Sequence, residues 1–127
     1  MPVRSSRSSV LKWPDRETVD RAIREWAAAV TRQRQDVLAI AYVGSYARGD
    51  WGVGSDVDLL IVVAASEQPF HRRALEFDTR ALPVPADVLV YTVAEWRTMA
   101  RGEGRLWRVA EQEGVWVKDA RDEIEVC

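Results

Sequence analysis

The sequence predicts an α/β domain built around one small sheet. Three apolar stretches of strand length lie at residues 37–43, 57–63 and 87–92, and a shorter one follows at 115–117. Segments with helical periodicity separate them, and alternating strands and helices favour a sheet flanked by helices. A chain of 127 residues is large enough to bury one hydrophobic core.

The first two helices are expected before the first strand and between the second and third. A helix start is indicated by Trp13-Pro14-Asp15. Four apolar residues then recur at helical spacing and form one stripe: Val19, Ile23, Trp26 and Val30. A second helix is expected over residues 69–80, with Phe70, Ala74 and Phe77 on one side.

The last third of the chain is also expected to be largely helical. Thr92 and Glu95 have the spacing of a capping box, in which each side chain bonds the backbone N–H of the other, so a helix is expected over 93–100. Glycines at 102 and 104 interrupt it, and a further helix follows. Gly114 is expected to stop that helix before the last strand.

Composition and charge indicate an ordinary globular protein. The net charge of −2 argues against a nucleic-acid partner. The one cysteine, Cys127, allows neither a disulfide nor a cysteine-based zinc site within the chain. No apolar stretch approaches the ~18 residues of a membrane span, so a cytoplasmic location is expected. We expect residues 1–12 to form a flexible tail and residues 13–127 a single domain.

A glycine-rich loop joins the first two strands. Gly44 and Ser45 follow the first strand, and Ser45 can begin a short helix that runs to Arg48. The N-terminus of a helix presents free N–H groups and a partial positive charge, which suit a phosphate. Gly44 lacks the Cβ that would block a close approach, and the Ser45 hydroxyl adds a donor. Taken alone this turn is weak evidence, because most Gly-Ser turns are ordinary turns.

Three acids stand at the starts of two strands. Asp56 and Asp58 precede and open the second strand at spacing i, i+2, so their side chains point to the same side. Asp87 opens the third strand. If the two strands neighbour each other, the three carboxylates meet at one edge of the sheet, where their repulsion favours protonation unless a cation binds. Hard oxygen ligands of this kind suit Mg²⁺ or Mn²⁺.

Together these residues resemble the signature of the DNA polymerase β-type nucleotidyltransferase superfamily. Gly44-Ser45, ten residues and then Asp56-x-Asp58 fit its G-S-x10-D-x-D pattern, with Asp87 in the place of the third carboxylate. The short chain is similar to the minimal nucleotidyltransferases (MNT). Many of these accompany a HEPN protein as the antitoxin of a toxin–antitoxin pair and transfer AMP from ATP to a tyrosine of the toxin.

The resemblance implies a polymerase β-like fold, a small mixed sheet flanked by helices, in which the glycine-rich loop binds the nucleotide. Gly44 and Ser45 would hold the β- and γ-phosphates of ATP. Arg48 and Ser55 lie in the matched flanks of the pattern and would support the phosphates or the loop.

The resemblance also implies the metal ligands and the partner. Asp56 and Asp58 would bind two Mg²⁺ ions, with Mn²⁺ as the alternative, and Asp87 would bind the ion at the acceptor hydroxyl and accept its proton. The expected acceptor is a HEPN-type partner protein in a homo- or hetero-oligomer. Two other hypotheses remain: transfer to a small molecule such as an aminoglycoside, and an antitoxin that acts by binding alone.

Overall fold

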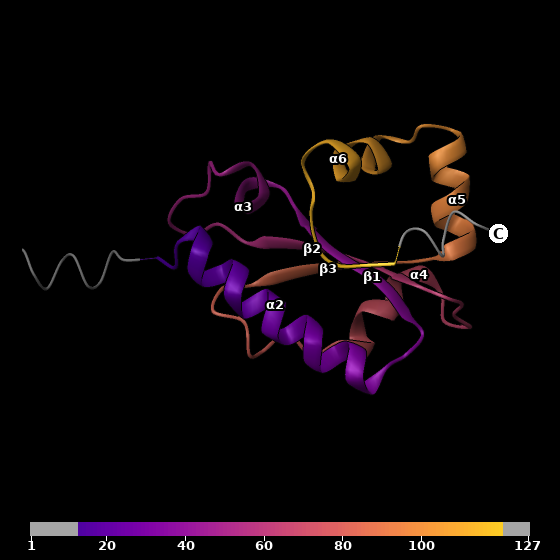
Figure 1. Ribbon diagram of the computed structural model, residues 1–127, viewed down its shortest axis with the longest axis horizontal. Coiled ribbons are helices and arrows are strands. Elements are labelled where there is room, and N and C mark those ends of the chain that lie inside the picture. The colour runs from indigo at the N-terminus through magenta and orange to yellow at the C-terminus, as the bar shows by residue number, and fades with distance from the viewer. Residues whose placement is uncertain (1–12, 121–127) are drawn as a thin grey trace, which may run out of the picture.

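Four strands form one mixed sheet at the centre of the fold. The computed structural model describes residues 13–120 and orders the strands β3-β2-β1-β4 (Figure 1). The central strand β1 (Val37–Val43) pairs antiparallel with β2 (Val57–Val63) and with β4 (Val115–Asp119). β3 (Ala86–Thr92) pairs parallel with β2. The mixed α/β architecture predicted from the sequence is therefore confirmed, and the bounds of β1 and β2 agree with the predicted strands.

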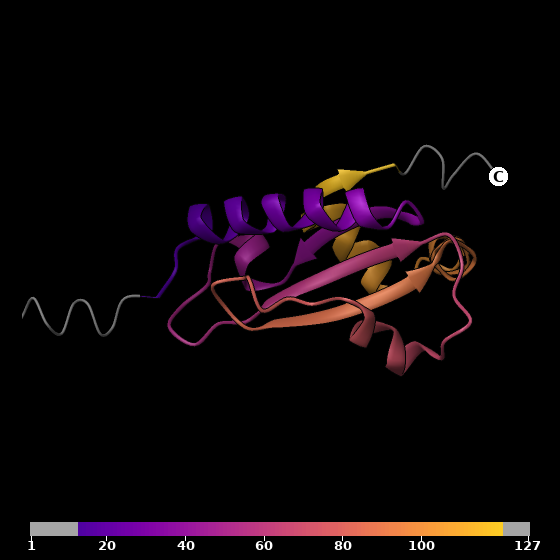
Figure 2. The same ribbon diagram turned by 90° about the horizontal axis from the view of Figure 1, so that it is seen from below.

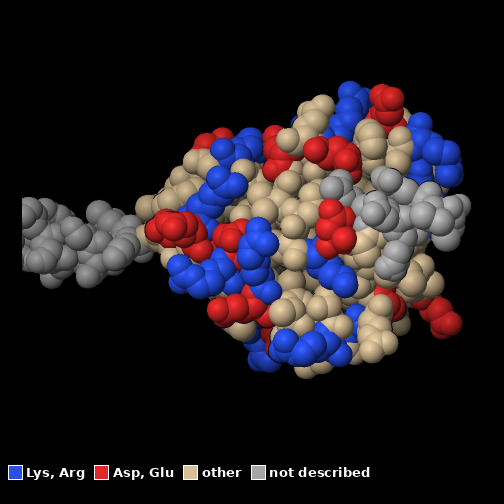
Figure 3. Space-filling model, viewed as in Figure 1, with Lys and Arg blue, Asp and Glu red and all other residues tan. Residues whose placement is uncertain are grey.

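The long helix α2 (Arg16–Gln33) covers one face of the sheet. Asp15 caps it, because its side chain accepts a hydrogen bond of 2.9 Å from the Thr18 N–H. Three residues of the predicted stripe are buried and the fourth packs half-buried against the same cluster: Val19, Ile23 and Trp26, then Val30. On the outer side of α2, charges of both signs are interspersed (Figure 3), which is typical of a solvated helix face.

Two shorter helices cover the opposite face. They are α5 (Val93–Arg101) and α6 (Arg105–Glu113), and Figure 2 shows α5 at the carboxyl ends of β2 and β3. The predicted capping box is present, since the Thr92 hydroxyl accepts from the Glu95 N–H and the Glu95 carboxylate accepts from the Thr92 N–H. α5 therefore begins directly after β3, and one residue separates the end of α6 from β4 (Val115–Asp119).

The helix predicted over residues 69–80 is wrong beyond residue 76. The chain forms only α4 (Phe70–Arg73) and one 3₁₀ turn, η1 (Ala74–Glu76). Phe77 follows in an extended conformation and is buried, while Phe70 is 41% exposed, so the two rings do not share one side of a helix. Burial of Phe77 against the α2 face outweighs the weak preference of so short a segment for a helix.

Gly114 ends α6, as predicted. Its φ of −67° and ψ of 145° are extended rather than left-handed. A Cβ at this position would crowd the carbonyl of Ala110, so the glycine is needed for a close approach and not for a positive φ. The predicted N-terminal tail and the segment with Cys127 lie outside the described residues. Among residues 13–120, no helix combines the length and apolar character needed to cross a membrane.

Candidate active site

The register of the sheet brings the predicted site residues to one end of three neighbouring strands. Asp58 and Asp87 are direct partners in the parallel pairing of β2 with β3. Val43, the last residue of β1, is the antiparallel partner of Asp58, so Gly44 follows directly beside it. The expectation that the second and third strands neighbour each other is therefore confirmed.

Both strand carboxylates lie on the face of the sheet that α5 and α6 cover further along. Leu60 packs in the α5–α6 cluster and Leu89 packs against it, and side chains alternate along a strand. Asp58, two residues before Leu60, and Asp87, two residues before Leu89, therefore point to this same face. Asp58 is half-buried and Asp87 is exposed. Asp56 is also exposed and precedes the first residue of β2.

The Asp58 carboxyl lies in a negatively charged and partly buried environment. Burial raises the pKa of the Asp58 carboxyl above its ordinary value, and the negative charges of Asp87 and Asp56 raise it further. The guanidinium of Arg48 opposes this shift. Within residues 13–120, no three acidic, histidine or cysteine side chains lie close enough together in this conformation to hold a metal ion. The assignment of Asp56, Asp58 and Asp87 as metal ligands thus stays a prediction.

Gly44 occupies a backbone conformation that other residues rarely adopt. Its φ of 86° and ψ of −153° lie in a region that is essentially restricted to glycine. A Cβ at this position would collide with the carboxylate oxygen Oδ2 of Asp58. The glycine therefore lets the turn after β1 pass directly against the half-buried carboxylate.

The short helix predicted after Gly44 is present as α3 (Ser45–Arg48). Its first hydrogen bond runs from the Arg48 N–H to the Gly44 carbonyl at 2.9 Å. The three preceding N–H groups, which begin at Ser45, have no acceptor within the helix. Donors of this kind suit the oxygens of a phosphate.

Aromatic residues and one serine hold the loop after α3. Tyr46 and Trp51 are stacked, with ring centroids 5.6 Å apart. Ser55 closes the loop, because its hydroxyl accepts a bond of 2.8 Å from the Gly52 N–H. The indole N–H of Trp13, just before α2, donates to the Ser55 carbonyl at 3.3 Å. Of the two roles predicted for Ser55, these contacts favour support of the loop.

Arg48 lies at the end of α3 and bonds two acids. Its Nε donates to Asp50 at 3.1 Å and its Nη1 donates to Glu113 at 3.3 Å. Glu113 is the last residue of α6, so this ion pair joins α6 to the short helix α3. Sequence reasoning missed Glu113, because its contact spans 65 positions and carries no local pattern.

The donor set fits a hard divalent cation. Carboxylates at the start of β2 and β3 offer the oxygen donors that such a cation prefers, and the register places Asp58 directly beside Asp87. Asp56, Asp58 and Asp87 are the residues that would hold such an ion. A mixed sheet with helices on both faces, a glycine turn and acids at the same strand ends define the class: a polymerase β-like nucleotidyltransferase fold.

Comparison with known families identifies the chain. Residues 23–117 match the nucleotidyltransferase domain, so the chain belongs to this family of transferases. The matched range includes the glycine turn and all three acids. The resemblance inferred from Gly44-Ser45 and the Asp56-x-Asp58 pair is confirmed at the level of the family. A comparison with curated proteins found no significant match.

Two solved structures have a similar fold. One is assigned as a nucleotidyltransferase from Sulfolobus solfataricus, with 24% identity, a TM-score of 0.52, and coverage of 79% of this chain and 82% of that one. The other is described as a toxin–antitoxin with AMP-PNP, with 16% identity, a TM-score of 0.53, and coverage of 81% and 78%. At these identities the similarity establishes the fold alone.

Proposed function

We propose that the protein is a Mg²⁺-dependent nucleotidyltransferase that moves a nucleoside monophosphate, AMP from ATP, to a hydroxyl group of a partner protein. The observation that carries this proposal is the register of β2 and β3, which pairs Asp58 with Asp87 beside the Gly44 turn. Metal-binding carboxylates and a phosphate-binding turn are the two parts that transfer from a triphosphate requires.

The reaction forms a bond between the acceptor oxygen and the α-phosphorus of ATP. The bond from the α-phosphorus to the oxygen that bridges to the β-phosphate breaks, and pyrophosphate leaves with that oxygen. Divalent ions at the site would lower the charge repulsion between acceptor and phosphates and stabilise the leaving group. Asp87 is exposed at the edge strand and can accept the proton of the acceptor hydroxyl.

The remaining predicted residues would bind the triphosphate. The N–H groups at Ser45 and the two following residues would donate to the β- and γ-phosphates, and the absence of a side chain at Gly44 allows the approach. Arg48 would add positive charge, which its ion pairs with Asp50 and Glu113 now neutralise. Ser55 would keep the loop closed around the nucleotide.

We further propose a HEPN-type toxin as the acceptor protein. The toxin–antitoxin protein with a similar fold was solved with a nucleotide analogue, AMP-PNP, which supports a pairing of this fold with a nucleotide and a partner. An antitoxin that acts by binding alone is the competing hypothesis that the experiment below excludes or supports.

Labelled ATP tests the reaction. The protein is incubated with Mg²⁺, with the protein encoded by the gene next to its own (the neighbour) and with ATP that carries label at either the α- or the γ-phosphate. Label that enters the neighbour from the α-position alone supports nucleotidyl transfer. Entry from the γ-position indicates a kinase-like reaction, and no entry from either position supports an antitoxin that only binds.

A melting experiment tests the metal site without turnover. Mg²⁺ with a nonhydrolysable ATP analogue should raise the melting temperature, because a ligand that binds only the native state stabilises it. Asp58→Asn should remove most of this gain. Asp78→Asn is the matched control, because Asp78 is exposed and pairs only with Arg80 among the described residues. If Asp58→Asn keeps the full gain, the ion binds elsewhere.

A further inference from the structure

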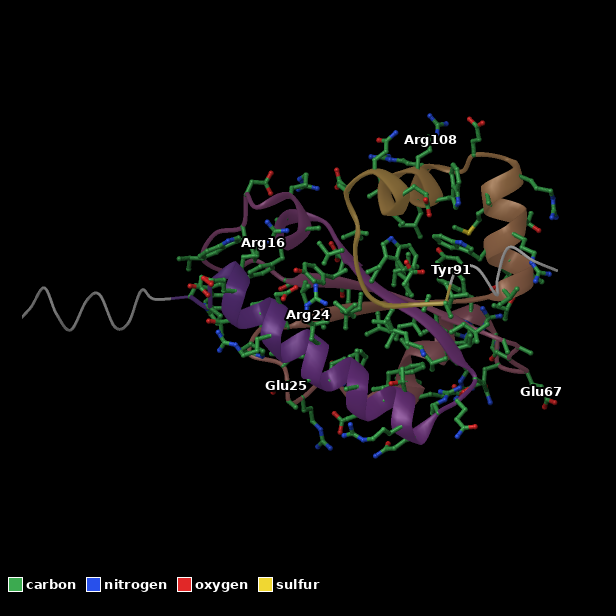
Figure 4. All side chains as sticks on the ribbon, viewed as in Figure 1. Arg16, Arg24, Glu25, Glu67, Tyr91 and Arg108 are labelled. Atoms are coloured by element: carbon green, nitrogen blue, oxygen red, sulfur yellow. The ribbon has the colours of Figure 1, made fainter. Side chains whose placement is uncertain are left out.

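An apolar groove lies on the same face of the sheet as the site carboxylates. It has a volume of about 450 Å³ and runs between α4, β3 and α5 (Figure 4, beside the labelled Tyr91). Its lining is mainly apolar: Phe70, Tyr91, Ala94 and Met99, with Glu95 and Thr98. Nothing in the proposed transfer chemistry uses this groove.

The aromatic wall of the groove is held in place before any ligand arrives. The Phe70 and Tyr91 rings are 5.0 Å apart and tilted by 42°. The guanidinium of Arg73 lies 5.8 Å from the centre of the Phe70 ring. Arg73 is itself fixed by Glu95, with bonds of 2.6 and 3.1 Å. Phe70 nevertheless stays 41% exposed, so a prearranged apolar surface faces solvent.

The groove and the active site share one strand, β3, which is at the edge of the sheet. Every second residue of a strand points to the same face of the sheet, so the side chains of Asp87, Leu89 and Tyr91 on β3 share one face. Asp87 and Tyr91 are four residues apart, which is about 13 Å at ~3.3 Å per residue. A polypeptide that lies extended along β3 has the same rise, so about four of its residues would span the distance from the groove to Asp87.

The charge beside the groove favours an acidic residue next to the bound apolar side chain. The lining acid Glu95 is neutralised by its bidentate pair with Arg73. Arg101 is exposed and donates to the hydroxyl of Thr98, which lines the groove, at 3.3 Å. Among residues 13–120 no acid forms an ion pair with Arg101, so its positive charge is available to a ligand beside the apolar pocket.

We propose that this groove docks the acceptor polypeptide, by binding an apolar or aromatic side chain that stands about four residues from the acceptor hydroxyl in an extended acidic segment. The proposal rests on the proposed function, since it assigns the acceptor of that reaction. It supplies the acceptor-binding surface that the nucleotide site itself lacks.

The test measures peptide binding apart from catalysis. The probe is a fluorescein-labelled peptide of twelve residues with one phenylalanine, one tyrosine four residues further on and three glutamates. Its affinity for the full chain is measured by fluorescence anisotropy with EDTA and without nucleotide. We expect saturable binding that weakens about tenfold or more when serine replaces the phenylalanine, because the apolar anchor is lost. Equal binding of the two peptides, or none, overturns the proposal.

Two alanine substitutions locate the binding surface. Ala94→Glu places a charge in the groove, at the first turn of α5, where an acid is compatible with the helix dipole. Ala28→Glu is the matched control, an exposed alanine in α2 on the opposite face of the sheet. Ala94→Glu should weaken peptide binding about tenfold and leave the melting temperature unchanged, while Ala28→Glu should have no effect. Equal losses in both variants overturn the proposal.

A spacing series connects docking to transfer. With Mg²⁺ and α-labelled ATP, peptides whose tyrosine stands four residues from the phenylalanine should accept label at least tenfold faster than peptides with a spacing of one or ten. Equal labelling at all spacings overturns the docking proposal while it supports the transferase. Absence of labelling together with anchor-dependent binding counts against the transferase and leaves the groove as a peptide-binding site.

Discussion

Replacement of Gly44 by alanine tests whether the turn after β1 is shaped around Asp58. Two independent effects oppose the new side chain. The backbone at φ 86° and ψ −153° is nearly restricted to glycine, and the added Cβ would collide with Oδ2 of Asp58. Alanine can be accommodated only if the turn, the carboxylate or both move.

The expected loss of stability follows from the backbone term. Residues forced into such a conformation cost about 1–3 kcal/mol. For a domain of this size, 1 kcal/mol corresponds to about 4 °C in melting temperature, so Gly44→Ala should melt about 4–12 °C lower. The collision adds to this loss unless Asp58 rotates away, in which case binding of Mg²⁺ with an ATP analogue should be lost as well.

Two neighbouring glycines provide controls, measured by thermal unfolding and urea titration. Gly52 has an ordinary φ and no atom near its missing Cβ, so Gly52→Ala should be neutral or slightly stabilising. Gly54 has a φ of 87° but open space around it, so Gly54→Ala reports backbone strain without a collision. In the double variant Gly44→Ala with Asp58→Ala, the carboxylate is absent, so the stability lost through the collision should be regained while the loss from backbone strain remains. If Gly44→Ala melts like Gly52→Ala, the turn is not constrained in the way argued.

Three further predictions concern the start of α5, where Thr92 and Glu95 form the capping box and Arg73 bonds Glu95. Arg73→Met should lower the free energy of unfolding by about 2–3 kcal/mol in urea titrations, because the buried guanidinium bonds the Val90 carbonyl and Glu95; a loss below 0.5 kcal/mol contradicts this. Glu95→Gln keeps a capping acceptor but loses the charge. The hydrogen bond from Arg73 lowers the pKa of Glu95, so its stabilising effect is present above the ordinary value of 4.5 and disappears as the pH falls through the lowered pKa. The difference between wild type and Glu95→Gln, about 1 kcal/mol at pH 7, should therefore vanish in acid, and a constant difference would refute the ion pair. Thr92→Ala should cost about 1 kcal/mol, or about 4 °C, through loss of the cap, which calorimetry can detect.

Several elements could be predicted from local patterns because their causes are local. β1 and β2 are nearly continuous apolar runs, and their predicted limits agree with the structure. The capping box at Thr92 and the turn helix after Gly44 involve residues no more than four apart. The helix expected over residues 69–80 failed because burial of Phe77, a tertiary contact, decided the conformation of that segment.

The sequence by itself indicated the nucleotidyltransferase family, since the spacing of Gly44, Asp56 and Asp58 is contained in one loop and the strand after it. Only the tertiary structure decided how these residues meet. The parallel direction of β3 and its register place Asp87 beside Asp58, and either could differ without any change in local pattern. The Glu113 contact to Arg48 and the Tyr91 groove likewise join distant segments. Periodicity and turn residues specify which side of an element is buried, whereas strand order and packing specify which residues become neighbours.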